Sequence, residues 1–210
     1  MTIRVLLAED HAIVREGLRA ILQREGFEVA GEAADGMEAV AVAKETLPHV
    51  AVLDFDMPRM NGITAAQELV RVSPKTKTLL LTMYADRQYV VGALRAGING
   101  FVIKSQASAD LVQAIRMVHD GNPYLSPGIS ATVVEAFASP GETERPLLTP
   151  RERQVLQLVA EGKSTKEAAR ILSISVKTAE SHRTRVMAKL DLHDTASLVR
   201  YAIREGFIQA

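Results

Sequence analysis

Hydrophobic positions in the first 120 residues follow two alternating periods. Runs of consecutive aliphatic residues, without polar alternation, are typical of strands that are buried on both faces. Five such runs occur, at residues 3–8, 27–33, 50–53, 78–81 and 100–103. Segments with apolar residues three or four positions apart, the period of an amphipathic helix, follow them. These segments are residues 13–22, 37–47, 63–70, 89–96 and 111–118. Five βα units in this length predict an open parallel sheet with helices on both sides.

The pattern is interrupted between residues 121 and 146, which we interpret as a linker. Three sequences rich in Gly, Pro, Asn and Ser indicate turns. They are Gly121-Asn122-Pro123, Ser126-Pro127-Gly128 and Ser139-Pro140-Gly141. A short helical stretch at 129–137 lies among them, and we expect flexibility from 139 to 146. The predicted organisation is therefore a domain at 1–120, a linker at 121–146 and a smaller domain at 147–210.

The smaller domain has a helical period throughout. Thr149, Pro150 and Glu152 combine a helix N-cap, a proline at the first helical position and a capping box. We predict four helices, the first ending near Gly162 and the others at about 165–172, 176–190 and 194–206. The sequence Ser173-Ile174-Ser175 forms a tight turn between the second and third helices. A helix, a tight turn and a helix can place the later helix in the DNA major groove. A small helical bundle with a mixed polar surface is the alternative interpretation.

Composition narrows the class of protein. Hydrophobic residues make up 47% of the 210 residues, enough to fill two cores, and cysteine is absent. The absence of cysteine excludes disulfides, thiolate metal sites and thiol catalysis. The chain opens on a strand-like run instead of a signal peptide, and no apolar stretch approaches the roughly 20 residues of a membrane span. We therefore expect a cytoplasmic protein with no membrane partner.

The zero net charge conceals an asymmetry between the two domains. Residues 1–120 contain 15 acidic and 13 basic side chains, whereas residues 148–210 contain 11 basic and 7 acidic side chains. A basic domain attached to an acidic one indicates a polyanionic partner for the basic domain. An ordinary solvated surface would show the same small surplus.

Polar residues directly follow four of the five hydrophobic runs. Ligands of an open parallel sheet bind beyond the carboxyl ends of its strands, so these residues are candidates for a site. They are Glu9, Asp10, Asp54, Thr82 and Lys104. Three neighbouring carboxylates repel one another unless a cation is present, and hard oxygen ligands suit Mg²⁺. A carboxylate beside Mg²⁺ can attack a phosphoryl group, whose oxygens a hydroxyl and an ammonium could hold. Taken singly, Asp10 could be a helix cap and Lys104 a solvated side chain.

These residues resemble a response-regulator receiver domain over about residues 2–120. The similarity rests on Glu9-Asp10, on Asp54-Phe55-Asp56-Met57-Pro58-Arg59-Met60-Asn61-Gly62, on Leu81-Thr82 and on Lys104. It implies a flavodoxin-like fold with strand order 2-1-3-4-5 and phosphorylation of Asp54 by a sensor histidine kinase. It also implies that Mg²⁺ binds Glu9, Asp10, Asp54 and the backbone carbonyl of Asp56. Lys104 would pair with the phosphoryl group, and Thr82 and Phe101 would act as switch residues.

The smaller domain resembles a LuxR-type helix-turn-helix domain over about residues 147–208. The similarity rests on Leu148-Thr149-Pro150-Arg151-Glu152, Lys166-Glu167-Ala168-Ala169, Val176-Lys177-Thr178-Ala179-Glu180-Ser181-His182 and Lys189-Leu190. With the receiver, the whole chain is similar to NarL/FixJ response regulators. This implies a transcription regulator that dimerises on phosphorylation and binds double-stranded promoter DNA, which we expect to be an inverted repeat.

The resemblance also assigns roles within the smaller domain. The expected DNA-binding residues are Lys177, Thr178, Glu180, Ser181, His182, Arg183, Thr184, Arg185 and Lys189. Among them Glu180, Ser181 and Thr184 would read bases, and the four basic residues would contact phosphates. Leu198, Tyr201 and Ala202 resemble the family's dimerisation helix, although core packing would explain the same apolar face.

Two other functions remain as alternatives. Asp54-Phe55-Asp56 also resembles the nucleophile motif of haloacid-dehalogenase-type phosphatases, in which the second Asp is the general acid. That interpretation leaves Glu9-Asp10 and the helix-turn-helix unexplained, so we predict that the chain is not an enzyme. A phosphorylated docking module that does not bind DNA is the other alternative.

Overall fold

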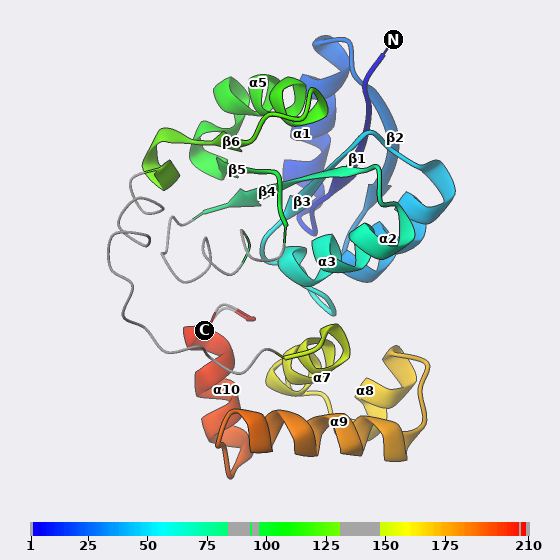
Figure 1. Ribbon diagram of the computed structural model, residues 1–210, viewed down its shortest axis with the longest axis vertical. Helices are drawn as coiled ribbons and strands as arrows, with labels where there is room; N and C mark the ends of the chain where they lie inside the picture. Colours follow the sequence, from blue (N-terminus) through cyan, green and yellow to red (C-terminus); the bar gives the residue numbers. More distant parts are fainter. Residues whose placement is uncertain (1, 84–92, 94–96, 131–147, 206, 209–210) are drawn as a thin grey trace. The chain divides into compact units, whose positions relative to one another are not determined.

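The structure is a computed structural model that describes residues 2–83, 93, 97–130, 148–205 and 207–208 (Figure 1). The helix expected at 89–96 and most of the helical stretch expected at 129–137 lie outside these residues. The chain divides into two compact units, Met1–Pro140 and Gly141–Ala210. None of the helices in the described residues is both long and apolar enough to span a membrane.

The first unit contains a parallel sheet of order β2-β1-β3-β4-β5-β6. The strands are β1 (Arg4–Ala8), β2 (Glu28–Ala33), β3 (Val50–Asp54), β4 (Lys77–Thr82), β5 (Gly100–Ile103) and β6 (Tyr124–Leu125). The five expected runs and the order 2-1-3-4-5 are confirmed. The sixth strand is a correction, because its residues were expected in the linker. Two residues between turn sequences have no strand period, yet the amides of Tyr124 and Ser126 donate to carbonyls of Asn99 and Phe101 and so extend the sheet.

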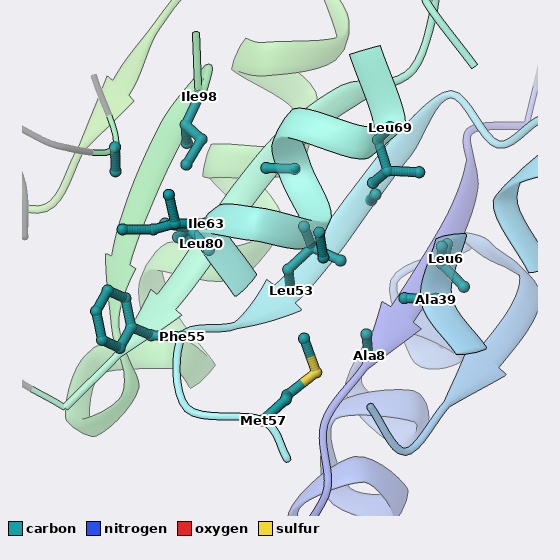
Figure 2. Packing of buried hydrophobic residues seen from close by; sticks show 14 of the residues in the cluster. Leu6, Ala8, Ala39, Leu53, Phe55, Met57, Ile63, Leu69, Leu80 and Ile98 are labelled. Carbon is teal, nitrogen blue, oxygen red and sulfur yellow. The ribbon is translucent and has the colours of Figure 1, made fainter. Parts of the chain in front are cut away.

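Helices cover both faces of the sheet. Helices α1 (Ala12–Arg24) and α5 (Ala107–His119) lie on one face, and α2 (Gly36–Thr46) and α3 (Gly62–Val72) lie on the other (Figure 1). Along β1, Val5 and Leu7 belong to the core under α1 and α5, whereas Leu6 and Ala8 belong to the core under α2 and α3 (Figure 2). Burial on both faces explains why the inner strands β1, β3 and β4 lack polar alternation.

The second unit contains the four expected helices. They are α7 (Pro150–Ala160), α8 (Thr165–Ile171), α9 (Val176–Lys189) and α10 (Thr195–Arg204). The capping box at Thr149 and Glu152 is confirmed, and Ser164 and Glu167 form a second one at the start of α8. The turn before α9 contains Ser173 in the left-handed region, with φ of 53°. Because α8 and α9 pack through small buried residues, chiefly Ala168, Ala169 and Ala179, they approach closely.

Candidate functional site

The sheet brings the polar residues at the strand ends to one edge. Glu9 and Asp10 follow β1, Asp54 ends β3, Thr82 ends β4, and Lys104 opens the short 3-10 helix η1 (Lys104–Gln106) after β5. These four strands are neighbours in the sheet, and each runs parallel to the next. Glu9, Asp54 and Thr82 are buried, with at most 5% of each residue exposed. The site therefore lies at the carboxyl edge, where polar groups are withdrawn from bulk water.

Lys104 joins the two buried carboxylates. Its Nζ lies 2.8 Å from Asp54 Oδ1 and 2.9 Å from Glu9 Oε2. Burial raises the pKa of Asp54 to about 7; the hydrogen bond and charge of Lys104 oppose this rise, and the charges of Glu9 and Asp56 add to it. Burial lowers the pKa of Lys104, but Asp54 and Glu9 outweigh that effect and raise it. The ammonium thus stays charged, while burial and the neighbouring acids disfavour ionisation of Asp54.

The oxygen atoms at this edge are suited to a divalent cation. Donor atoms of Glu9, Asp10, His11 and Asp54 lie within 4.8 Å of one another. Asp54 Oδ2 is buried and has no hydrogen-bond partner among the described residues. A buried oxygen of this kind requires a partner, and Mg²⁺ binds carboxylate oxygens while keeping several waters. The carboxylate oxygens of Glu9, Asp10 and Asp54 therefore fit Mg²⁺, whereas a carbonyl ligand from Asp56 stays a prediction.

His11 was not identified from the sequence. Its Nδ1 lies 2.7 Å from Asp10 Oδ1 and 3.2 Å from Glu9 Oε1. The charge of Asp10 is the main cause of the raised pKa of His11, and hydrogen bonds to Asp10 and Glu9 act in the same direction. The available signal was its position directly after Glu9-Asp10, at the N-cap of α1.

The loop after Asp54 is fixed at both ends. The Gly62 amide donates to the Phe55 carbonyl at 3.0 Å, at the start of α3. Nearer the middle, Arg59 forms an ion pair with buried Asp35. Asp35 is also the N-cap of α2, where its side chain accepts two backbone N–H bonds. This ion pair was also missed, because 24 residues separate its partners and neither belongs to a periodic pattern.

Phe101, one of the two expected switch residues, lies beside the segment that follows the receiver core. Phe101 is buried in the same hydrophobic cluster as Ile129, with Leu125 packed against it. Ser126 Oγ accepts a hydrogen bond from the Ile103 amide at 3.3 Å and donates one to Asp110 at 2.7 Å. The end of β5, which precedes Lys104, is therefore bonded to residues that lead out of the first unit.

Helix α9 exposes most of the residues expected to contact DNA. Lys177, Thr178, Glu180, Ser181, Thr184 and Arg185 are exposed, whereas His182, Arg183 and Lys189 are half-buried. Arg183 donates to the hydroxyls of Thr165 at 3.1 Å and Thr195 at 2.8 Å. Lys189 Nζ lies 2.7 Å from Oε2 of buried Glu152. Two of the four expected phosphate contacts thus have partners inside the domain, and their role at DNA stays a prediction.

The apolar face of α10 points into its own domain. Leu198 and Ala202 are fully buried. Tyr201 is half-buried, and its ring stacks on Phe207 with centroids 6.5 Å apart. Core packing accounts for two of the three residues, so a dimerisation role for this helix stays a prediction that rests on Tyr201.

Known proteins match both units of the chain. The family model "Response regulator receiver domain" matches residues 5–116, and the model "Bacterial regulatory proteins, luxR family" matches residues 146–202. The chain belongs to the LuxR-type response regulators of two-component systems. It is 36% identical to the oxygen regulatory protein NreC of Staphylococcus carnosus, an alignment that covers 98% of this chain and 99% of the relative. It is 34% identical to the transcriptional regulatory protein MctR of Rhizobium johnstonii, with 98% and 95% covered.

Solved structures agree with this family. The response regulator RcsB of Salmonella typhimurium has a TM-score of 0.60 at 30% identity, covering 95% of this chain and 97% of that one. Another RcsB structure, bound to a promoter in the presence of a phosphomimetic, has a TM-score of 0.61 at 29% identity, with 96% and 98% covered. This response regulator is accordingly a DNA-binding transcription regulator with a receiver domain.

In this response regulator, replacement of Gly62 by alanine is expected to destabilise the receiver and impair its site. A Cβ at Gly62 would lie 2.3 Å from the backbone oxygen of Asp54, so α3 or the strand must shift. Overpacking of this kind costs about 1–3 kcal/mol. Denaturant unfolding measures the loss, and labelling by a small phosphodonor measures displacement of Asp54.

Gly17→Ala is the matched control. Gly17 lies within α1, and a Cβ there would meet no atom within 4 Å. Alanine in a helix is favoured over glycine by about 1 kcal/mol, so this variant should be slightly more stable. Equal stability and equal labelling in the two variants would show that Gly62 does not control the site.

Proposed function

We propose that a sensor histidine kinase phosphorylates this response regulator on Asp54 with Mg²⁺, and that phosphorylation promotes dimerisation and promoter binding. One observation carries the proposal: a buried carboxylate, paired with Lys104, has a second oxygen without a partner among the described residues. Because the DNA-binding domain must reach chromosomal DNA, we propose that the protein acts in the cytoplasm.

In the proposed transfer, one Asp54 oxygen forms a bond to phosphorus as the bond between phosphorus and the donor atom breaks. Glu9, Asp10, Asp54 and the Asp56 carbonyl would hold Mg²⁺, which, when bound, neutralises charge on the phosphoryl oxygens. Lys104 can exchange its bond to Asp54 for one to a phosphoryl oxygen, because its ammonium already lies 2.8 Å from the reacting carboxylate. Thr82, at the end of the neighbouring strand, would hold another phosphoryl oxygen.

Contacts beyond β5 support a route from this site to the output domain. Movement of Lys104 would pull on Ile103, whose amide is bonded to Ser126. A change at Phe101 would disturb Ile129 in the shared cluster. Ser126 and Ile129 precede the connection to the second unit. We therefore propose that phosphorylation acts on the second unit by changing the contacts of these two residues. No direct contact between the two units is needed for this route.

The exposed face of α9 supports the proposed DNA contact. This helix presents Lys177, Glu180, Ser181, Thr184 and Arg185 to solvent, while Ala179 and Val186 pack against the rest of the domain. Small polar side chains between basic ones suit a helix in the major groove. There, contacts to phosphates position the protein, and contacts to base edges determine its sequence specificity. One of the solved RcsB structures is that of an RcsB–DNA complex.

Phosphorylation is expected to convert the protein from a monomer to a dimer. A dimer would bind DNA more tightly than a monomer, because a domain of about 60 residues makes few phosphate contacts alone and two copies on an inverted repeat double them. Sedimentation velocity with and without a small phosphodonor and Mg²⁺ measures the change, with Asp54→Ala as control. Identical sedimentation of the wild type in both conditions would contradict a phosphorylation-driven dimer.

A further inference from the structure

We propose that His11 supplies a nitrogen ligand to the metal site, so that Ni²⁺ and similar transition-metal ions bind through Glu9, Asp10, His11 and Asp54. This inference rests on the proposed function only in placing the metal beside Asp54. It assigns the site a second class of ion, besides Mg²⁺, and gives His11 a role that Mg²⁺ binding does not require.

The positions of the donor atoms match a coordination sphere. Metal–ligand bonds of about 2.1 Å place adjacent ligands of an octahedral ion about 3 Å apart, and opposite ones about 4.2 Å apart. His11 Nδ1 lies 2.7 Å from Asp10 Oδ1 and 3.2 Å from Glu9 Oε1. All four donors lie within 4.8 Å of one another. A small contraction of the cluster would therefore bring all four within bonding distance of one ion.

The local structure holds His11 in this position. Its backbone amide donates to Glu9 Oε1 at 3.2 Å, which fixes the start of α1 against the buried carboxylate. The side chain turns back onto the two acids and makes no cap for α1. With 72% of the side chain exposed, the imidazole gives an ion from solvent access to the acids behind it.

A second observation points to a ligand at the same place. Asp54 is 98% buried, and its Oδ2 has no hydrogen-bond partner among the described residues. Lys104 lies beside the other oxygen, Oδ1. Asp54 thus offers one oxygen to Lys104 and one to a cation, which His11 can approach from the exposed side.

The chemistry of the ligands separates the two classes of ion. Mg²⁺ takes oxygen ligands and keeps waters, so it can bind the carboxylates without the imidazole. Ni²⁺ and Zn²⁺ bind imidazole nitrogen readily. Removal of His11 should therefore weaken the binding of Ni²⁺ and leave that of Mg²⁺ unchanged.

Calorimetric titration of the full chain with NiCl₂ and with MgCl₂ tests the proposal on three proteins: wild type, His11→Asn and His193→Asn. Asparagine is a favoured helix N-cap, so α1 should be retained. His193 is the control for an exposed imidazole, since its side chain is 85% exposed in the other domain. We expect His11→Asn to lower Ni²⁺ affinity at least about 10-fold. The His11→Asn variant should keep the wild-type Mg²⁺ affinity and the wild-type level of Mg²⁺-dependent labelling by a phosphodonor. The His193→Asn variant should keep the wild-type Ni²⁺ affinity, Mg²⁺ affinity and labelling.

Equal Ni²⁺ affinity in the wild type and His11→Asn, or no Ni²⁺ binding by the wild type, would overturn the proposal. An equal loss of Mg²⁺ affinity would also overturn it, because His11 would then act through the carboxylates and not as a ligand. These outcomes are distinct from failure of the proposed function. If the wild type acquires no phosphoryl group on Asp54, the phosphoacceptor assignment fails whatever Ni²⁺ does.

Discussion

Replacing Asp54 with alanine is expected to abolish phosphorylation completely. The wild type, incubated with a small phosphodonor and Mg²⁺, should gain the mass of one phosphoryl group, and Asp54→Ala should gain none. A chelator should prevent the gain, because the carboxylates of Glu9, Asp10 and Asp54 are compatible with an incoming phosphate only beside a cation. Intact-mass spectrometry measures all of these results.

Two further variants test the assignment of Asp54 as the phosphoacceptor. Asp56→Ala is the matched control: it removes a neighbouring carboxylate but keeps the backbone carbonyl proposed as a ligand, so labelling should persist. Lys104→Ala should retain labelling but uncouple it from dimerisation. The ammonium that lies 2.8 Å from Asp54 would be missing, so no side chain at this position would bind the phosphoryl group and move with it. A full gain of mass in Asp54→Ala would place the phosphoacceptor elsewhere.

Replacing Glu180 with alanine is expected to relax DNA sequence preference at one position in each half-site. A carboxylate facing DNA is repelled by phosphates unless a base donates a hydrogen bond to it, and cytosine N4 is the suitable donor. Loss of that contact should cost roughly 1–3 kcal/mol of discrimination. Non-specific binding should hold or increase, since a negative charge is removed. Selection from randomised duplexes, followed by affinity measurement on the selected sequences, measures both effects.

Glu180 could instead form a helical ion pair with Lys177 or Arg183, each three residues away in the sequence. Arg183 instead donates to Thr165 and Thr195, and Glu180 forms no ion pair among the described residues. Asp191→Asn is a control for charge alone: Asp191 lies just beyond α9, with φ of 52°, a conformation that asparagine tolerates. It should leave the selected motif unchanged. If Glu180→Ala also returns the wild-type motif, Glu180 does not read bases.

Periodicity located the elements of the sheet, and the resemblance to receiver domains implied their order. The five predicted strands lie within one residue of the observed bounds, because runs such as Val50–Asp54 are buried on both faces and have no polar interruption. Strand β6 was missed because two residues cannot display a period. The apolar period of residues 13–22 begins with Ile13, yet Ile13 is 87% exposed, and the buried residues of α1 are Leu18 and Leu22.

The candidate site was predictable where its residues end strands, since topology then places them together. Contacts made by loop residues were not predictable. Asp35 and Arg59 lie in separate loops, and their ion pair depends on the packing of α2 beside α3. On α9, charge alone indicated phosphate contacts for Arg183. Its partners, Thr165 and Thr195, occupy the first positions of two other helices and are visible only in the folded domain.

We propose that phosphorylation of Asp54 controls DNA binding by α9. The most direct test measures, at fixed salt, the affinity of the wild type and Asp54→Ala for a selected duplex, with and without phosphodonor and Mg²⁺. The wild type should bind about 5–150-fold more tightly when phosphorylated, the range typical of coupled sites, and the affinity of Asp54→Ala should not change. Equal affinity of the phosphorylated and unphosphorylated wild type would show that phosphorylation does not control DNA binding.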